Sequence, residues 1–159
     1  PFTSAVPYCL DADGMPLLLI SRLARHTSHA SADNRVSLFV QECLPGKDIQ
    51  ASPRLCLSGH LLPVPDSGLL AAADRYYRFF PQCHGFHREL DFRFFRLEPV
   101  RAHFIAGFAR VCWLEAEELV QRNPLAPEAE GEIVRHMNED HAEALPCYWR
   151  QAGRLLTES

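Results

Sequence analysis

A tight-turn signal near the start of the chain constrains its fold more than any other feature. Two apolar segments, residues 2–10 and 15–21, flank the sequence Asp11-Ala12-Asp13-Gly14. Glycine readily adopts the positive φ that a hairpin turn requires, and apolar runs on both sides of such a turn are typical of paired strands. We therefore expect the chain to begin with a β-hairpin, which favours an antiparallel sheet.

Further strand-like segments follow, with helical segments between them. The strand candidates are residues 36–42, 54–64, 91–97 and 101–105. We expect Gly59 to kink or bulge the second of these strands. Residues 23–32 contain no Gly or Pro, and residues 67–80 repeat apolar side chains at helical spacing with Ser67 as N-cap. The pattern predicts a mainly β, α+β domain with two interrupting helices.

The number and order of these segments suit a small antiparallel barrel. Closing a sheet removes the exposed strand edges that promote aggregation. A sandwich of the same strands is the alternative, because periodicity does not separate the two. After Trp113 the sequence becomes acidic and helix-forming, with no strand signal. We therefore place a barrel domain at residues 1–112 and an incomplete helical appendage at residues 113–159.

Charge and hydropathy argue against two classes of partner. The 16 basic residues are scattered and the net charge is −4, so we expect no nucleic-acid partner. No apolar run approaches the roughly 20 residues that a membrane span needs, so we expect no membrane partner and a cytoplasmic location. Because the chain begins at Pro1, the removal of a targeting segment stays open.

The cysteines indicate a reduced protein. The six residues Cys9, Cys43, Cys56, Cys83, Cys112 and Cys147 are far apart in the sequence. They form no CxxC pair and no Cys/His cluster at zinc-finger spacing. We expect free thiols, with three disulfides as the alternative that an even count allows.

A polar corner follows the hairpin. The segment Ser21-Arg22-Leu23-Ala24-Arg25-His26-Thr27 leaves an apolar strand and opens the first helix. Hydroxyl, guanidinium and imidazole groups and the amides of a helix N-terminus can each donate a hydrogen bond to an anion. The corner is therefore a candidate phosphate site. A helix cap with two solvated arginines is the alternative.

A second candidate is the segment His136-Met137-Asn138-Glu139-Asp140-His141, in which two histidines surround two carboxylates. Side chains five positions apart on a regular helix point about 140° away from each other, whereas one-faced zinc ligation uses a spacing of four. We therefore expect no metal site here. Instead, His141 should pack on an apolar stripe, and His136 should be solvated beside carboxylates.

A third polar group lies between the second helix and the following strand. It contains His84, Gly85, His87, Arg88 and Glu89. Two histidines three positions apart in a Gly-containing loop could approach a ligand, and loops often carry function. Exposed polar residues without a role are the alternative.

The ordered segments together resemble a known family. Residues 1–42 are similar to the N-terminal half of FMN-binding split barrels related to pyridoxamine phosphate oxidase. They contain, in order, a strand, a DxxG turn, a second strand, SRLARHT and DNRVSLFV. The similarity is greatest to their HugZ-type haem-utilisation branch, since RLCLSG, FRFFRLEP and RAHFIAGFA follow in the same order. IVRHMNEDHAEA resembles the opening of the helical domain that follows this barrel. The resemblance implies a six-stranded antiparallel split barrel with interrupting helices and a C-terminal helical appendage.

The resemblance also implies a homodimer that binds haem or FMN in a groove between its subunits. Carried onto the matching positions, the resemblance assigns anion anchoring to Ser21, Arg22, His26 and Thr27, with Ser4 on the neighbouring strand as a further candidate. One position departs from the pattern, because His29 stands where relatives usually have Asn.

The source of an iron ligand is a further point of departure. The HugZ-type haem oxygenases take their axial histidine from a far C-terminal part, which we expect to lie beyond Ser159. Among the histidines of this chain, His141, His136 and His87 are the fallback iron ligands, since haem needs a neutral imidazole.

Two functions follow from the sequence. The first is a haem- or flavin-binding oxidoreductase, resembling a haem oxygenase, in which protein groups orient the cofactor. The second is a non-catalytic dimeric binding or regulatory module that has lost the cofactor. The weak motif chemistry slightly favours the second function, whereas the polar corner argues against it.

Overall fold

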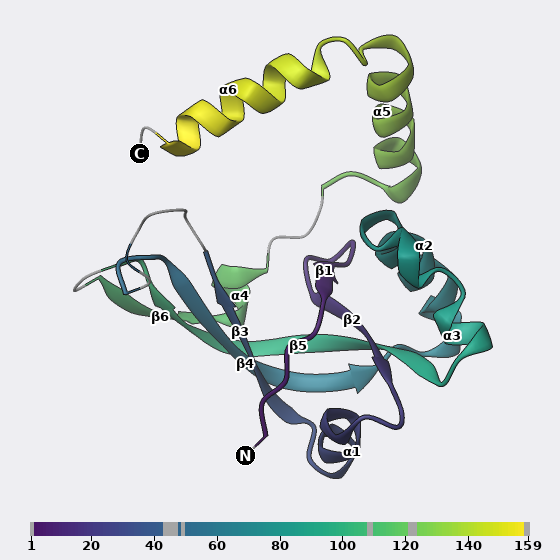
Figure 1. Ribbon diagram of the computed structural model, residues 1–159, viewed down its shortest axis with the longest axis vertical. Helices are drawn as coiled ribbons and strands as arrows, with labels where there is room; N and C mark the ends of the chain where they lie inside the picture. Colours follow the sequence, from purple (N-terminus) through teal and green to yellow (C-terminus); the bar gives the residue numbers. More distant parts are fainter. Residues whose placement is uncertain (1, 43–47, 49, 108–109, 121–123, 158–159) are drawn as a thin grey trace. The chain divides into compact units, whose positions relative to one another are not determined.

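The computed structural model (Figure 1) describes residues 2–42, 48, 50–107, 110–120 and 124–157, without the side chains of residues 127 and 153–157. In chain order the elements are β1 (Tyr8–Leu10), β2 (Pro16–Ser21), α1 (Arg25–Ala32), β3 (Arg35–Gln41), β4 (Arg54–Pro63), η1 (Asp66–Gly68), α2 (Leu69–Phe79), η2 (Pro81–Cys83), α3 (Phe86–Glu89), β5 (Phe92–Ile105), β6 (Val111–Glu115), α4 (Ala116–Leu119), α5 (Pro127–Asp140) and α6 (Leu145–Thr157).

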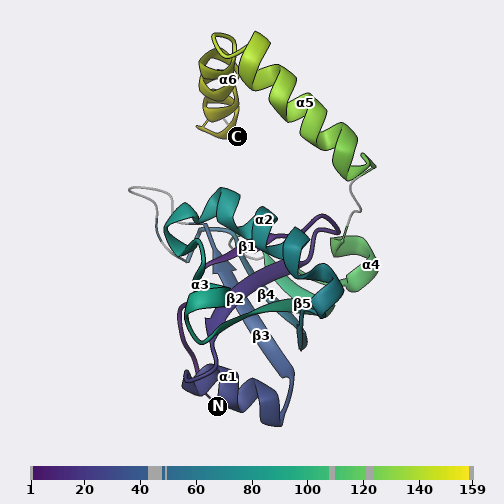
Figure 2. The same ribbon diagram turned by 90° about the vertical axis from the view of Figure 1, so that its right-hand side faces the viewer.

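The strands form one curled antiparallel sheet, which confirms the expected fold class. Their order is β1-β2-β5-β4-β3, and β6 pairs with β5. The long strand β5 pairs with β2 along its first half, with β6 along its second half and with β4 on its other side. Both views show α1 at one end of the sheet, beside the N-terminal segment (Figures 1 and 2). This ordering leaves β1 and β3 at the two ends of the path through the split barrel, and β6 is a further strand paired on one side.

The chain divides into two compact units, Pro1–Arg122 and Asn123–Ser159. The boundary that we expected at residue 112 falls inside β6. Antiparallel pairing with β5 holds β6 in the sheet, and Leu119 of α4 packs against the barrel core. The first unit therefore extends past the expected boundary, because β6 and α4 both belong to the barrel.

A bulge at Val100 of β5, opposite Ser58 and Gly59 of β4, lets one long strand form where two were expected. The register of β4 against β5 shifts between Ser58 and Gly59, and Gly59 lies opposite Pro99. A Cβ at position 59 would stand 2.1 Å from the carbonyl oxygen of Glu98, so only glycine fits. Proline has no N–H to donate and is tolerated at such a bulge. The expected irregularity at Gly59 is confirmed as a shift of register, although the extra residue, Val100, lies in β5. The expected interruption at Glu98-Pro99 is wrong.

The strand β2 is buried on both faces, which explains its uninterrupted apolar sequence. Successive side chains of a strand point to opposite faces. Accordingly Leu18 and Ile20 belong to the core inside the curled sheet, whereas Leu17 and Leu19 belong to a second core under α2. The largest side chain of the second core is Tyr76, which is 1% exposed.

The helices differ from expectation at their ends. α2 begins at Leu69 with Gly68 as N-cap, and the expected cap Ser67 lies in the preceding η1 turn. The appendage holds two helices, α5 and α6, separated after Asp140.

No helix within the described part of the chain has the length and apolar character to cross a membrane.

Five cysteines lie in the described part of the chain, and all are free thiols, as expected. They are Cys9, Cys56, Cys83, Cys112 and Cys147. Only Cys9 is buried, and burial raises the pKa of its thiol to about 11. Cys43 lies outside the described residues.

Candidate active-site cavity

A cavity of about 880 Å³ lies at the seam of the split barrel. The N-terminal segment, residues 2–6, and Tyr8 of β1 line one side. The opposite side is lined by residues 35–39 of β3. Because these two edge strands do not pair with each other, the opening between them is available to a ligand. We call this feature the seam cavity.

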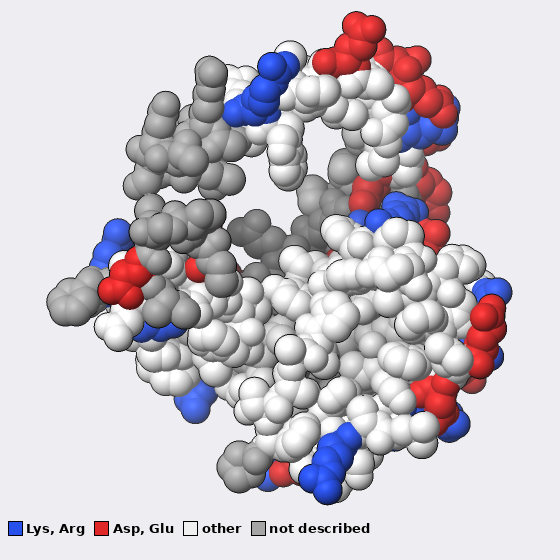
Figure 3. Space-filling view, in the orientation of Figure 1, with Lys and Arg blue, Asp and Glu red and all other residues white. Residues whose placement is uncertain are grey.

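The seam cavity has an apolar floor. Leu18, Ile20, Leu61 and Leu97 line it, and all four belong to the barrel core. The charged side chains of the first unit lie mainly at the margin of the face shown in Figure 3. Ligand pockets combine a mostly apolar lining with a few placed polar groups, and the seam cavity follows this pattern.

Helix α1 supplies polar groups to the same cavity from one face. Residues at positions i, i+3 and i+7 of a helix lie on one side. His26, His29 and the C-cap Asp33 have this spacing, and all three line the seam cavity. Two imidazoles one helical turn apart therefore face one apolar space.

The two imidazoles are held differently. The Nδ1 of His26 lies 3.1 Å from the hydroxyl of Ser4 in the N-terminal segment. Its Nε2 is buried and has no hydrogen-bond partner among the described residues. The ring of His29 is exposed and meets the ring of Phe2 edge-on, with centroids 5.3 Å apart. The N-terminal segment thus contacts both histidines.

Three of the remaining residues of the polar corner already have protein partners. The hydroxyl of Thr27 donates to the carbonyl oxygen of Ser21 at 2.6 Å, and the Ser21 hydroxyl accepts the N–H of Leu23 at 3.2 Å. Arg22 makes an ion pair with Asp91. Of the five carried-over residues, Ser4 and His26 line the seam cavity. Ser21 and Thr27 stabilise the turn into α1, and Arg22 binds Asp91 just before β5.

Arg35 places a guanidinium at the cavity rim. Its Nε donates to both carboxylate oxygens of Asp33, at 2.9 and 3.2 Å. These hydrogen bonds lower the pKa of Asp33 to about 2, so the carboxylate stays ionised and orients the arginine. Neither Arg35 nor His29 stood among the expected site residues. For His29, the sequence signal was its position three residues after His26, which places both side chains on one face of a helix.

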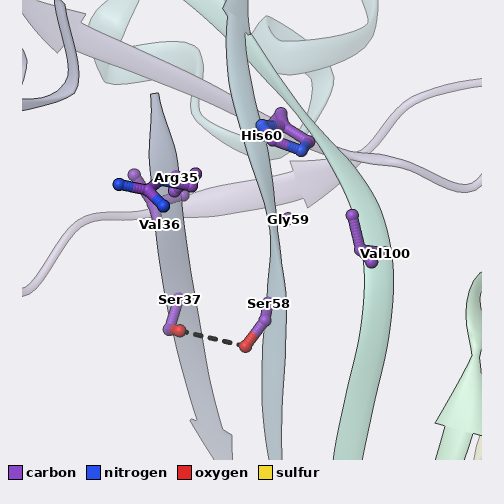
Figure 4. Close-up of a pocket in the computed structure, with 7 residues that line it drawn as sticks. All are labelled: Arg35, Val36, Ser37, Ser58, Gly59, His60 and Val100. Carbon is purple, nitrogen blue, oxygen red and sulfur yellow. Dashed lines mark hydrogen bonds between the residues drawn. The ribbon is translucent and has the colours of Figure 1, made fainter. Parts of the chain in front are cut away.

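A shallower pocket of about 390 Å³ lies on the outer face of the sheet (Figure 4). The hydroxyls of Ser37 and Ser58 lie 3.1 Å apart across β3 and β4. His60 faces the same pocket, and its Nδ1 lies 3.2 Å from the amide oxygen of Asn34. Arg35 lines this pocket and the seam cavity, so the two openings meet at the start of β3.

His87 lies outside the seam cavity, and both of its ring nitrogens are engaged. Arg88 Nε donates to His87 Nε2 at 3.3 Å, so His87 Nδ1 carries the proton and donates to the hydroxyl oxygen of Tyr77 at 2.6 Å. Burial, followed by the charges of Arg88 and His84, lowers the pKa of His87. These contacts keep His87 neutral and in place beneath α2.

The expected separation of His136 and His141 is wrong. Helix α5 ends at Asp140, and His141 leaves the helix as its C-cap. The two rings therefore meet edge-on with centroids 4.8 Å apart. His141 is exposed rather than packed, and His136 Nδ1 lies 2.7 Å from Asp140 Oδ2. The described residues contain no group of three or more metal-ligating side chains placed to hold an ion.

Comparisons with known proteins agree with this architecture. The model of the CREG β-barrel family matches residues 1–121. The chloroplastic heme oxygenase HOZ of Arabidopsis thaliana is 28% identical over 149 residues, which cover 90% of this chain and 45% of that protein. The chain thus spans less than half the length of this relative.

Two solved structures share the fold and more than a quarter of the aligned residues. A heme-binding protein from Mycobacterium smegmatis is 27% identical with a TM-score of 0.67, covering 88% of this chain and 58% of that one. The heme storage protein HutZ from Vibrio cholerae is 26% identical with a TM-score of 0.52, covering 59% of this chain and 68% of that one. The relatives agree with the resemblance to the HugZ-type haem-utilisation branch. The chain belongs to the CREG β-barrel family of split-barrel proteins.

Proposed function

We propose that this chain binds haem in the seam cavity and supports oxygenase-like redox chemistry there as a homodimer. The observation that carries the proposal is an 880 Å³ cavity with an apolar floor and two imidazoles on one helical face. Ligand-binding cavities typically measure about 300–1,000 Å³. The names of the relatives, a heme oxygenase, a heme-binding protein and a heme storage protein, support the same ligand.

Different residues of the cavity lining suit different parts of the haem molecule. The leucine and isoleucine floor fits an apolar macrocycle, and an imidazole fits the iron. The guanidinium of Arg35 fits a carboxylate, which it already binds in Asp33. Bound haem supplies the iron-centred redox chemistry, while the protein supplies binding, orientation and exclusion of water.

Haem is favoured over FMN by the internal bonding of the polar corner. A flavin phosphate needs several free donors around one anion. The Thr27 hydroxyl donates to a backbone carbonyl, and the Arg22 guanidinium is paired with Asp91. The Thr27 hydroxyl and the Nε of Arg22 are therefore already engaged at this corner, whereas haem in the seam cavity needs neither residue.

Titration with haemin tests the proposal. We expect the full chain to shift the Soret band in a saturable way with a Kd below about 10 μM, which corresponds to about 7 kcal/mol. Ala5→Glu places a carboxylate on an exposed wall residue of the seam cavity and should weaken binding about tenfold, or about 1.4 kcal/mol. Ala12→Glu, in the exposed hairpin turn, is the matched control and should bind like wild type.

The same titration separates the candidate functions. Addition of a reductant in air should bleach the Soret band of an oxygenase, whereas a binding module should keep its bound haem intact. Absence of a haemin complex below 10 μM would overturn the proposed ligand, and FMN binding with a flavin spectrum would replace it.

A homodimer is supported by the outer face of the sheet. The registers place Phe39, Cys56, His103 and Trp113 in one row across β3, β4, β5 and β6. The end members of the row are large apolar side chains that are 60% and 57% exposed. In the next row Arg101 lies opposite Glu115. A two-fold axis through such a face can cover apolar groups with apolar groups and pair opposite charges.

The mass in solution tests the dimer. We expect a particle of twice the 18.0 kDa chain mass. Trp113→Glu should dissociate it, because a charge at the centre of an apolar interface is left unpaired. Trp149→Glu, at an 82% exposed tryptophan of α6, should leave the mass unchanged. A monomeric wild type, or a dimeric Trp113→Glu variant, would rule out this interface.

A further inference from the structure

We infer that the shallow pocket on the outer face of the sheet, here called the outer pocket, binds the carboxylate end of the ligand. This assignment rests on the proposed haem function, because haem carries its propionate carboxylates on one edge of an apolar macrocycle. The outer pocket and the seam cavity share the lining residues Arg35, Val36 and Ser37 at the start of β3. A ligand whose apolar part occupies the seam cavity can therefore extend into the outer pocket.

Strand pairing gathers polar side chains in the outer pocket. β3 and β4 place Ser37 directly opposite Ser58. They also place Arg35 opposite His60. Alternate residues of a strand share a face, and all four of these side chains line the pocket shown in Figure 4. The outer pocket is thus a polar site that adjoins the apolar floor of the seam cavity.

The irregular pairing of β4 with β5 forms another part of the pocket wall. Val100 is the extra residue of the bulge, it is 48% exposed, and it lines the outer pocket. Gly59, which lies opposite the bulge, lines the pocket as well. Bulges re-aim side chains and are common beside active sites. The hollow therefore depends on the same two positions that break the register of the sheet.

The two serines keep a hydrogen available for an anion. The hydroxyl oxygens of Ser37 and Ser58 lie 3.1 Å apart, and either hydroxyl can donate to the other. Whichever one donates, the accepting hydroxyl keeps its own hydrogen. Among the described residues neither hydroxyl has a further partner. The pair can therefore donate one strong, charge-assisted hydrogen bond to a carboxylate in either arrangement.

The charges around Arg35 favour the outer pocket over the seam cavity for a carboxylate. Asp33 accepts hydrogen bonds from Nε and Nη2 of Arg35, which leaves Nη1 of the guanidinium to donate elsewhere. The ionised Asp33 lines the seam cavity but not the outer pocket. None of the described residues that line the outer pocket carries a carboxylate. A ligand carboxylate is therefore repelled by Asp33 on the seam side and attracted by Arg35 on the outer side.

The position of the outer pocket also agrees with the proposed dimer. Ser37 and Ser58 lie two residues from Phe39 and Cys56, which belong to the row at the proposed interface. A ligand carboxylate in the outer pocket would lie beside that interface, in line with the groove between subunits that the family resemblance implies.

Esterification of the ligand tests the assignment. Haemin dimethyl ester keeps the iron and the macrocycle but has no carboxylate. The full chain is titrated with haemin and with the ester, and Kd is measured from the Soret band. Wild type should bind haemin at least about tenfold more tightly than the ester, because hydrogen bonds to a charged group are strong. Ser37→Ala/Ser58→Ala should weaken haemin binding at least about fivefold and leave the affinity for the ester unchanged.

A charge placed in the outer pocket gives a second, independent readout. Ser37→Asp should abolish the preference for haemin over its ester, because two carboxylates at close range repel each other. The matched controls are Ser28→Ala/Ser31→Ala and Ser28→Asp, which make the same changes at exposed positions of α1 outside both cavities. Both controls should bind like wild type, and circular dichroism should show that every variant folds.

The outcomes separate this assignment from the haem function. If wild type binds neither compound, both proposals fail. If wild type binds haemin and the ester equally well, the haem function stands and the outer pocket does not hold the ligand carboxylate. A preference for haemin that persists in Ser37→Asp and in Ser37→Ala/Ser58→Ala would also overturn the assignment. Equal binding of haemin and ester, together with acetate binding that the double variant loses, would assign the pocket to a free small carboxylate instead.

Discussion

The variant Gly59→Ala is expected to lose about 3 kcal/mol or more of its free energy of unfolding. A Cβ at this position would lie 2.1 Å from the Glu98 carbonyl oxygen and 2.9 Å from two further backbone atoms of β5. Overpacking of a core usually costs about 1–3 kcal/mol. Here every clashing atom belongs to the backbone, so no side chain can rotate away. Relief requires β4 and β5 to move apart at the bulge.

Gly131→Ala is the matched control. It makes the same chemical change in the middle of α5, where a Cβ would meet no atom within 4 Å. An exposed helical glycine is about 1 kcal/mol less favourable than alanine, so this variant should be slightly more stable than wild type. Urea unfolding followed by circular dichroism measures both. An unchanged midpoint for Gly59→Ala would contradict the close approach of β4 to β5.

The same variant should also affect the ligand site. Leu61 follows Gly59 by two residues on β4 and forms part of the cavity floor. Separation of β4 from β5 would move this floor, and haemin affinity should fall together with stability. Gly131→Ala, which lies in the other unit, should keep wild-type haemin affinity.

The barrel was predictable where local chemistry agrees with tertiary structure. Gly14 adopts a φ of 81° in the hairpin turn, as the DxxG sequence predicted. Pro99 misled the prediction, because proline is normally excluded from central strands and is accommodated here by the bulge at the neighbouring Val100, opposite Gly59. The strand Val111–Glu115 was missed because its five residues lead directly into an acidic helical turn.

The site was predictable only in part, because it depends on which side chains share one cavity. Ser4 and His26 were expected from the family resemblance and lie together at 3.1 Å. The other corner residues were expected to bind an anion, yet they bind the backbone and Asp91. Sequence alone does not show whether a hydroxyl or guanidinium already has a protein partner. His141 was misplaced because nothing in its local sequence marked the end of α5 at Asp140.

Tyr76→Ala is expected to destabilise the first unit by about 3–5 kcal/mol, the usual cost of removing a large buried aromatic side chain. Tyr76 is 1% exposed, and its ring packs against the rings of Phe80 and Phe94, with centroid distances of 4.7 and 5.7 Å. Its hydroxyl lies 3.5 Å from the carbonyl oxygen of Pro7. The residue therefore connects α2 to β5 and to the segment that leads into the cavity wall.

Two companion variants show whether the packed ring accounts for this loss. Tyr76→Phe removes only the hydroxyl and its contact with Pro7, so it should cost about 1 kcal/mol. Tyr148→Ala removes the same side chain from a 59% exposed position of α6 and should stay within about 0.5 kcal/mol of wild type. Equal losses for Tyr76→Ala and Tyr148→Ala would mean that the second core does not hold α2 on the sheet. A large loss confined to Tyr76→Ala, with weaker haemin binding, would tie this core to the N-terminal wall of the seam cavity.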